Sequence, residues 1–280
     1  MKRQSGNFEG RELKNLFFQC WLPENNVKAY IVAIHDLATD SDRFEIIAEY
    51  LTENGYTLYS FDLRGHRRNS GGFPGNIDSI DHIQKDIVLF MDLVRKNAGD
   101  KLIFLMGHSL GGLISIIYAI NHPGLPGVVV SSPTLGLFLE SMVDKKIAKK
   151  LARSVAKLAP NKLIKINIDQ NQLTSDLKIL RKQIADKNTL ETITAKTLAE
   201  INNAMKWAMD NASDLICPIL LQQAGDDKLV DKKKNEEFFK KIKSEDKTYR
   251  EYDGFLHDLW NEKGRAQVYQ DLYIWLEKHL

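Results

Sequence analysis

Two kinds of apolar segment alternate along most of the chain. Strand-length apolar segments recur at 16–22, 29–35, 56–63, 102–106, 127–133, 218–223 and 247–252. Helix-like segments lie between them, at 44–55, 79–98, 113–120, 230–242 and 265–279. Continuous apolar runs are typical of strands buried on both faces of a parallel sheet, and spacings of three or four are typical of helices. The alternation predicts an α/β fold with a mostly parallel, doubly wound sheet.

The alternation stops between about residues 136 and 213. This stretch has helical patterns with breaks at Pro160 and around 167–171, and no strand is predicted in it. It follows the strand after the segment 113–120 and precedes the strand at 218–223. We therefore expect an inserted helical cap at 137–213, above the carboxyl edge of a sheet built by residues 1–136 and 214–280.

A serine stands at the junction of two buried segments. The apolar run 102–106 leads into Gly107-His108-Ser109-Leu110-Gly111, and an apolar helical segment follows. Glycines on both sides allow the strand and helix backbones to approach closely. The pattern is that of a nucleophile elbow, with Ser109 exposed on a sharp turn at a helix N-terminus. A glycine-rich turn with an incidental serine is the alternative.

A serine hydroxyl needs a base, and the base needs an orienting acid. In an elbow fold the expected chain order is serine, acid, histidine. Asp226 and Asp227 stand at the end of the strand 218–223, and His257 lies in a loop before the last helix. Of the seven histidines, His257 is the one placed to act as the base, whereas His82 and His122 are expected to be structural.

Composition is that of an ordinary globular protein. The formal net charge of +2 gives no support to nucleic-acid binding. Cys20 and Cys217 are expected in strands, as reduced thiols. No signal peptide is visible at the N-terminus, and no apolar run approaches the ~18 residues that span a membrane. These features predict a cytoplasmic enzyme, and nothing in them implies a metal or cofactor.

Five collinear stretches carry a resemblance to a known family. They are IHDLATDSDRF at 34–44, FDLRGHRRNSGG at 61–72, GHSLGG at 107–112, AGDDKLVD at 224–231 and GFLHDLWNE at 254–262. Together they resemble the monoacylglycerol lipase and lysophospholipase family of α/β-hydrolases, the serine aminopeptidase-like group. The resemblance implies the α/β-hydrolase fold and hydrolysis of carboxylic esters of lipids without a cofactor.

The resemblance also implies roles for five residues. Ser109 would be the nucleophile, Asp227 the acid and His257 the base. The backbone N–H groups of Leu37 and Leu110 would form the oxyanion hole. A short-chain carboxylesterase or a thioesterase is the alternative activity, and a catalytically silent binding protein is the alternative from another class.

Departures from the family pattern fall beside the expected site. Asp36 and Arg67 stand where the pattern has glycines, and Asp258 replaces a glutamate. A carboxylate that pointed inward would oppose the developing oxyanion, so Asp36 is expected to point outward. Arg67 is expected to alter its loop. Arg64, His66 and His108 are expected to support loops.

The first part of the expected cap is basic. Residues 137–214 hold 14 Lys and Arg against 9 Asp and Glu, and six of the cations fall on the helical segment 142–160. The favoured interpretation is a helix that packs its apolar face inward and solvates its lysines. The alternative is peripheral contact with an anionic membrane. Candidate residues for an acyl tunnel, with ordinary packing as the alternative, are Leu137, Phe138, Leu139 and Met142.

Overall fold

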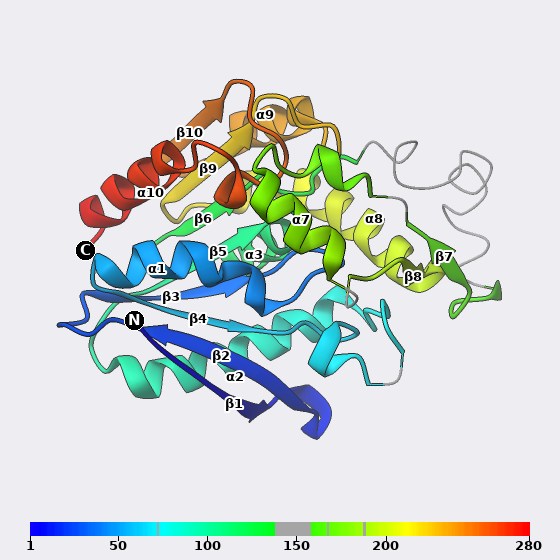
Figure 1. Ribbon diagram of the computed structural model, residues 1–280, viewed down its shortest axis with the longest axis horizontal. Coiled ribbons are helices and arrows are strands. Elements are labelled where there is room, and N and C mark those ends of the chain that lie inside the picture. Colours follow the sequence, from blue (N-terminus) through cyan, green and yellow to red (C-terminus); the bar gives the residue numbers. More distant parts are fainter. Residues whose placement is uncertain (72, 138–157, 167, 187–188) are drawn as a thin grey trace.

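The computed structural model describes residues 1–71, 73–137, 158–166, 168–186 and 189–280. In this part of the chain one eight-stranded sheet has the order β1-β2-β4-β3-β5-β6-β9-β10 (Figure 1). Its strands are β1 (Lys2–Glu9), β2 (Asn15–Leu22), β3 (Ala29–Ile34), β4 (Tyr56–Phe61), β5 (Ile103–His108), β6 (Val128–Ser131), β9 (Ile219–Ala224) and β10 (Lys247–Tyr252). From β4 to β10 all neighbours are parallel, and β1 and β2 add an antiparallel edge. The predicted mostly parallel α/β sheet is confirmed.

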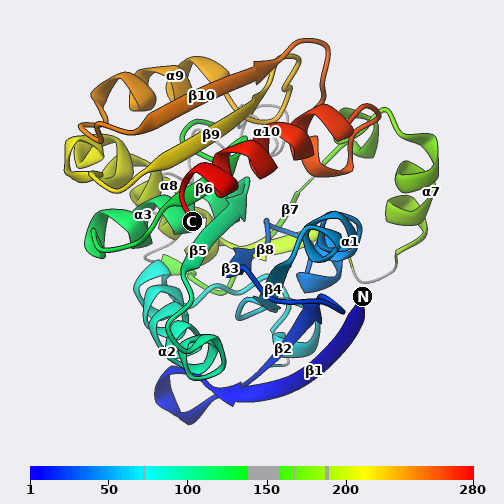
Figure 2. The same cartoon turned by 90° about the vertical axis from the view of Figure 1, so that its left-hand side faces the viewer.

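Helices cover both faces of this twisted sheet (Figure 2). One core cluster includes residues of α2 (Ile80–Ala98), α3 (Leu110–Asn121) and α9 (Lys232–Lys241), and the other includes residues of α1 (Glu45–Glu53) and α10 (Ala266–Lys278). Strand β3 contributes to both, since Val32 and Ile34 join the first cluster while Ile31 and Ala33 join the second. Side chains alternate between the faces of a strand, so burial on both faces explains why the strand reads as a continuous apolar run.

The edge strand β1 was not predicted from the sequence. Its residues are mostly exposed, and Phe8 is its buried side chain. A strand that buries so little carries no apolar pattern by which it could be recognised. The expected strand position of Cys217 is also wrong, because β9 begins two residues later. Both cysteines are buried and free, and burial raises the pKa of each thiol.

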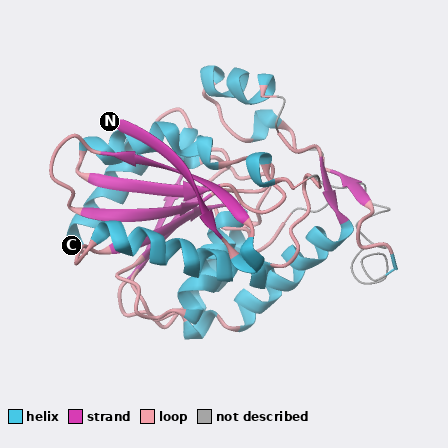
Figure 3. Ribbon diagram, turned by 90° about the horizontal axis from the view of Figure 1, so that it is seen from below, coloured by secondary structure: helices cyan, strands magenta, loops and turns pink. Residues whose placement is uncertain are grey.

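The insert between β6 and β9 lies at the end of the sheet toward which the β3 and β4 arrows point (Figures 1 and 3). Its described helices are α7 (Leu177–Ala185) and α8 (Ala195–Asp210). The expectation that it holds no strand is wrong, because β7 (Leu163–Lys165) and β8 (Thr192–Thr194) pair antiparallel. Strands of three residues are too short to produce a pattern in the sequence. Residues 142–157 of the expected basic helix, and Phe138, Leu139 and Met142, lie outside the described residues.

Helix α8 connects this insert to the core. Ile201, Ala204 and Ala208 are buried within the same cluster as α2 and α3. At the N-terminus of α8 the Thr194 side chain accepts a hydrogen bond from the Thr197 N–H, which caps the helix. None of the described helices combines the length and the apolar content that crossing a bilayer requires.

Candidate active site

Ser109 occupies the turn between β5 and α3. Its backbone lies in the left-handed region, at φ +54° and ψ −117°. A Cβ on Gly107 would lie 2.2 Å from the Gly111 carbonyl oxygen, and one on Gly111 would lie 2.0 Å from that of Ile34. Both glycines are therefore needed for the close approach of strand and helix. A non-glycine residue in this strained conformation is typical of functional sites, and the geometry is that of the predicted elbow.

The side chain of Ser109 contacts a residue that the sequence did not single out. Ser109 Oγ lies 3.2 Å from Thr134 Oγ1, and the Thr134 N–H donates to the Ser109 carbonyl at 3.0 Å. Thr134 follows β6, the strand beside β5, so both residues lie at the same edge of the sheet. The sequence signal for Thr134 was its place in the chain, since it is a polar residue that follows the next buried strand after the elbow.

Asp227 and His257 are joined by a hydrogen bond of 2.8 Å between Oδ2 and Nδ1. The other oxygen of Asp227 accepts the backbone N–H groups of Leu229 and Val230, each at 2.9 Å. Both side chains are buried, whereas Asp226 is exposed. Burial and contact with the imidazole therefore distinguish Asp227 from its neighbour.

The environment of this pair stabilises charge on both partners. Burial on its own raises the pKa of Asp227, but His257 and the two N–H donors outweigh it and bring the pKa below its ordinary value. Burial likewise lowers the pKa of His257, yet Asp227, with smaller contributions from Asp36 and Asp258, brings that pKa above its ordinary value. An imidazole in this setting is suited to accept a proton.

Ser109 and His257 line the same cavity, which has a volume of about 500 Å³. Among the described residues no hydrogen bond joins their side chains, and the serine hydroxyl is instead bonded to Thr134. Bonds between a nucleophile and its base are often long without substrate and tighten when it binds. Six of the apolar residues that line the cavity are Leu37, Leu137, Ile168, Leu173, Ile179 and Leu229.

Leu37 and Leu110, whose backbone N–H groups were the expected oxyanion donors, both line this cavity. Leu110 is the first residue of α3, a position where the N–H has no partner within its own helix. Leu37 N–H belongs to the same peptide as the Asp36 carbonyl, which accepts from His35 Nδ1 at 2.8 Å. Carbonyl and N–H point in opposite directions across a trans peptide, so Leu37 N–H is directed away from His35.

His35 is itself fixed in one tautomer. Its Nε2 accepts from the Leu63 N–H at 2.8 Å, so the proton is on Nδ1, which donates to the Asp36 carbonyl. Burial, with the neighbouring His66 next in size, places the pKa of His35 well below its ordinary value. A neutral ring therefore links the β3 turn to the loop that follows β4.

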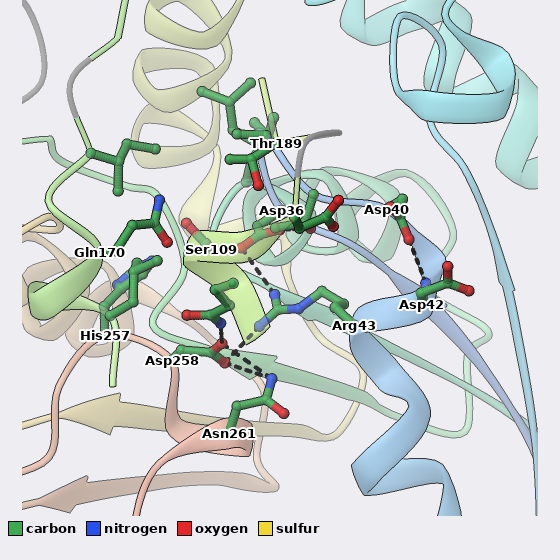
Figure 4. Close-up of a pocket in the computed structure, with 18 of the residues that line it drawn as sticks. Asp36, Asp40, Asp42, Arg43, Ser109, Gln170, Thr189, His257, Asp258 and Asn261 are labelled. Carbon is green, nitrogen blue, oxygen red and sulfur yellow. Dashed lines mark hydrogen bonds and ion pairs between the residues drawn. The ribbon is translucent and has the colours of Figure 1, made fainter. Parts of the chain in front are cut away.

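The expectation that Asp36 points outward is wrong. Asp36 is 9% exposed. Its carboxylate accepts a hydrogen bond from the Thr39 hydroxyl and lies 3.1 Å from Arg43 Nη1 (Figure 4). The buried guanidinium draws the carboxylate inward. Arg43, in the 3₁₀ segment η2 (Ser41–Phe44), lies within the RF part of the first motif stretch, and its role in the site was not predicted.

Arg67 has a backbone conformation that glycine adopts more readily than other residues. Its φ is +35°, in the left-handed region, and its Nη1 contacts Asp40 at 2.6 Å and Asp42 at 2.5 Å. These ion pairs hold a strained residue in the lining of the cavity. Arg64 was expected to support its loop. Its guanidinium donates hydrogen bonds to Asp86 and to the Arg11 carbonyl, which agrees with that expectation.

A family model described as Hydrolase_4, serine aminopeptidase, S33, matches residues 25–264. The chain belongs to this family. Among the relatives, phospholipase YtpA of Bacillus subtilis is 27% identical over 90% of this chain and 96% of its own length. Human monoglyceride lipase is 28% identical over 94% of this chain and 87% of its own length.

Solved structures share the whole architecture. The monoacylglycerol lipase of Paleococcus ferrophilus superposes with a TM-score of 0.82 and 25% identity, covering 95% of this chain and 99% of that one. The predicted α/β-hydrolase fold and the family resemblance drawn from the five motif stretches are both confirmed.

Proposed function

We propose that this S33 family member hydrolyses carboxylic esters of lipids, with a monoacylglycerol as the substrate favoured over a lysophospholipid. The observation that carries the proposal is the 2.8 Å bond between Asp227 and His257 in the cavity that Ser109 also lines. The relatives named as monoglyceride lipases and as a phospholipase support a lipid ester. The apolar lining of the cavity suits an acyl chain.

In the proposed mechanism His257 Nε2 removes the hydroxyl proton of Ser109 as its oxygen attacks the ester carbonyl. Asp227 holds the imidazole with Nδ1 protonated and stabilises its cationic form. The N–H groups of Leu37 and Leu110 donate to the oxyanion. The imidazolium then gives its proton to the leaving alcohol, and an acyl-serine ester remains. Water, activated by His257, releases the fatty acid and restores Ser109.

We further propose that residues 137–213 act as a cap over this site. Leu137, Ile168, Leu173 and Ile179 come from the insert and line the cavity opposite the sheet. For residues 142–157, which lie outside the described residues, the basic amphipathic sequence supports contact with an anionic lipid surface. Co-sedimentation with anionic and with neutral vesicles tests that contact, and absence of binding to both overturns it.

The decisive experiment compares a long-chain monoacylglycerol with a short-chain p-nitrophenyl ester, using Ser109→Ala as the control. We expect rapid monoacylglycerol turnover that the substitution abolishes. Turnover of the short ester alone, still dependent on Ser109, would indicate a carboxylesterase. Failure of a fluorophosphonate to label the folded wild-type protein would indicate a binding protein without catalysis.

A further inference from the structure

Three buried charged side chains form a continuous bridge across the site. Arg43 Nη1 lies 3.1 Å from Asp36 Oδ2, and Arg43 Nη2 donates to Asp258 Oδ1 at 2.6 Å (Figure 4). The side chains of Arg43 and Asp258 are each 6% exposed, and that of Asp36 is 13% exposed. The guanidinium is therefore enclosed between two carboxylates that belong to distant parts of the sequence.

The two ends of the bridge adjoin the two groups that must act together in the proposed mechanism. Asp36 directly precedes Leu37, whose N–H is a proposed oxyanion donor. Asp258 directly follows His257, the proposed base. Asp258 is held in turn by Asn261 Nδ2, at 3.1 and 3.2 Å, and by Gln183 Nε2 of α7 at 3.3 Å. The bridge thus connects four segments: the turn after β3, η2, the loop that carries His257 and Asp258, and the insert.

We propose that Asp36, Arg43 and Asp258 are positioning residues, which together hold the peptide that carries the Leu37 N–H at a fixed place relative to His257. This inference rests on the proposed function. His35 fixes one side of that peptide through the Asp36 carbonyl, and the bridge fixes the other through the Asp36 side chain. Misplacement of a catalytic group by about 1 Å can cost about 100-fold in rate.

Stability alone does not account for such a bridge. Burying ions carries a desolvation cost that often equals the attraction between them, so a buried ion pair is weak evidence for stabilisation. The motif that the stretch 34–44 resembles has a glycine where this chain has Asp36, so a buried carboxylate stands beside the proposed oxyanion site. Arg43 compensates its charge: Nη2 donates a hydrogen bond to Asp258 while Nη1 forms an ion pair with Asp36, and the planar guanidinium holds these two nitrogens at a fixed separation that an ammonium does not reproduce.

Several other groups face Asp36. His108 Nε2, at the end of β5, lies 3.9 Å from Asp36 Oδ2, and burial places the pKa of His108 well below its ordinary value. Burial also raises the pKa of Asp36, against the opposing effects of Arg43 and Thr39. From the loop that follows β10, Asp258 raises the pKa of Asp36 and His257 lowers it. With one guanidinium between two carboxylates, the bridge adds negative charge near the base.

The test is a double-mutant cycle on kcat and KM for a monoacylglycerol, with Asp36→Asn, Asp258→Asn, Arg43→Gln and their combinations. We expect Arg43→Gln to lower kcat by about 10- to 100-fold with KM nearly unchanged. Asp36→Asn should lower kcat several-fold in the wild-type background and less than about twofold beside Arg43→Gln, because its effect passes through Arg43. Equal effects of Asp36→Asn in both backgrounds, no effect, or a faster enzyme would overturn the bridge.

The pH profile of kcat/KM provides a second readout that a purely structural role would not move. Loss of the Asp36 carboxylate removes a group that raises the pKa of His257, so the acid limb of Asp36→Asn should shift to lower pH. If Arg43→Gln does not fold, Arg43→Lys takes its place, because lysine keeps the charge but lacks the planar guanidinium. A wild-type kcat for Arg43→Lys would contradict the proposal. Asp92→Asn and Arg95→Gln, from an exposed pair on α2, serve as matched controls.

Failure of the two proposals can be told apart. If Ser109→Ala retains full activity, the proposed function fails whatever the bridge variants do. If activity depends on Ser109 but the effects of the bridge variants simply add, the proposed function stands and the bridge is rejected.

Discussion

His257 Nδ1 is 2.8 Å from Asp227 Oδ2, while Asp227 Oδ1 is held by two backbone N–H groups of the following turn. The acid is thus fixed by its own loop before it orients the imidazole. The two N–H donors orient the carboxylate through the oxygen that does not contact His257.

Asp227→Asn should lower kcat by about 10²- to 10⁴-fold while the fold is retained. The amide can donate to Nδ1 and so favours the wrong tautomer, and it cannot stabilise the imidazolium. Ester hydrolysis by the purified variant measures the loss. Asp226→Asn is the matched control, because Asp226 is adjacent and exposed. Comparable losses in the two variants would contradict the assignment of Asp227 as the acid.

The acid limb of kcat/KM should have a midpoint above about 6.5, the ordinary pKa of histidine. The reaction needs neutral His257, and Asp227 outweighs burial to raise the pKa of that imidazole. In Asp227→Asn the midpoint should fall, since burial then dominates. Initial rates across pH 5 to 9 on a neutral ester give both midpoints, and a midpoint that does not change between the two proteins would refute the coupling.

The same pair should make stability depend on pH. The pKa of His257 is raised on folding, so its contribution is present below the unfolded pKa and is lost as pH rises through the folded pKa. The pKa of Asp227 is lowered, so its contribution is present above the unfolded pKa and is lost as pH falls through the folded value. Both contributions are complete between the two unfolded pKa values, so thermal melts of wild type and Asp227→Asn should differ most between about pH 4 and pH 6.5 and less at lower or higher pH. The same difference in melting temperature at about pH 3, pH 5 and pH 9 would contradict this.

The sequence predicted those parts of the molecule whose burial leaves a pattern. Strands β3, β4, β5, β6 and β9 are buried along their whole length, and Ser109 and Asp227 stand just after two of them. His257 follows the less buried edge strand β10. By contrast β1 is mostly exposed, and β7 and β8 have three residues each, so no periodicity marked them.

The polar contacts within the site could not be predicted in this way. The orientation of Asp36 depends on Arg43, seven residues later, and on Asp258, more than 200 residues away. Thr134 contacts Ser109 because β5 and β6 pair in one particular register. Such contacts join residues that are far apart in the sequence, so the pattern of apolar and polar positions does not predict them.

Gly107→Ala should destabilise the protein by about 1–3 kcal/mol and lower the yield of active enzyme. The added methyl would lie 2.2 Å from the Gly111 carbonyl oxygen and 2.5 Å from Ser115 Oγ, so the elbow must open. Urea unfolding measures the change. Gly124→Ala is the control, since nothing lies within 4 Å of the added Cβ. Equal stability of the two variants would show that the close approach is not required.

Thr134→Val should speed the reaction of Ser109 with a fluorophosphonate by up to about fivefold, the equivalent of one ordinary hydrogen bond of about 1 kcal/mol. The Thr134 hydroxyl lies 3.2 Å from Ser109 Oγ, and either hydroxyl can be the donor. When Ser109 donates, Thr134 competes with His257 for the serine proton. Valine keeps the shape of the side chain and also keeps the backbone bond from residue 134 to the Ser109 carbonyl. The elbow should therefore stay in place while its hydroxyl becomes free to turn toward the base. Thr248→Val, in the edge strand β10, is a control for the loss of a threonine hydroxyl elsewhere. A slower reaction of Thr134→Val, with an unchanged melting temperature, would instead mean that Thr134 holds the serine in its attacking position.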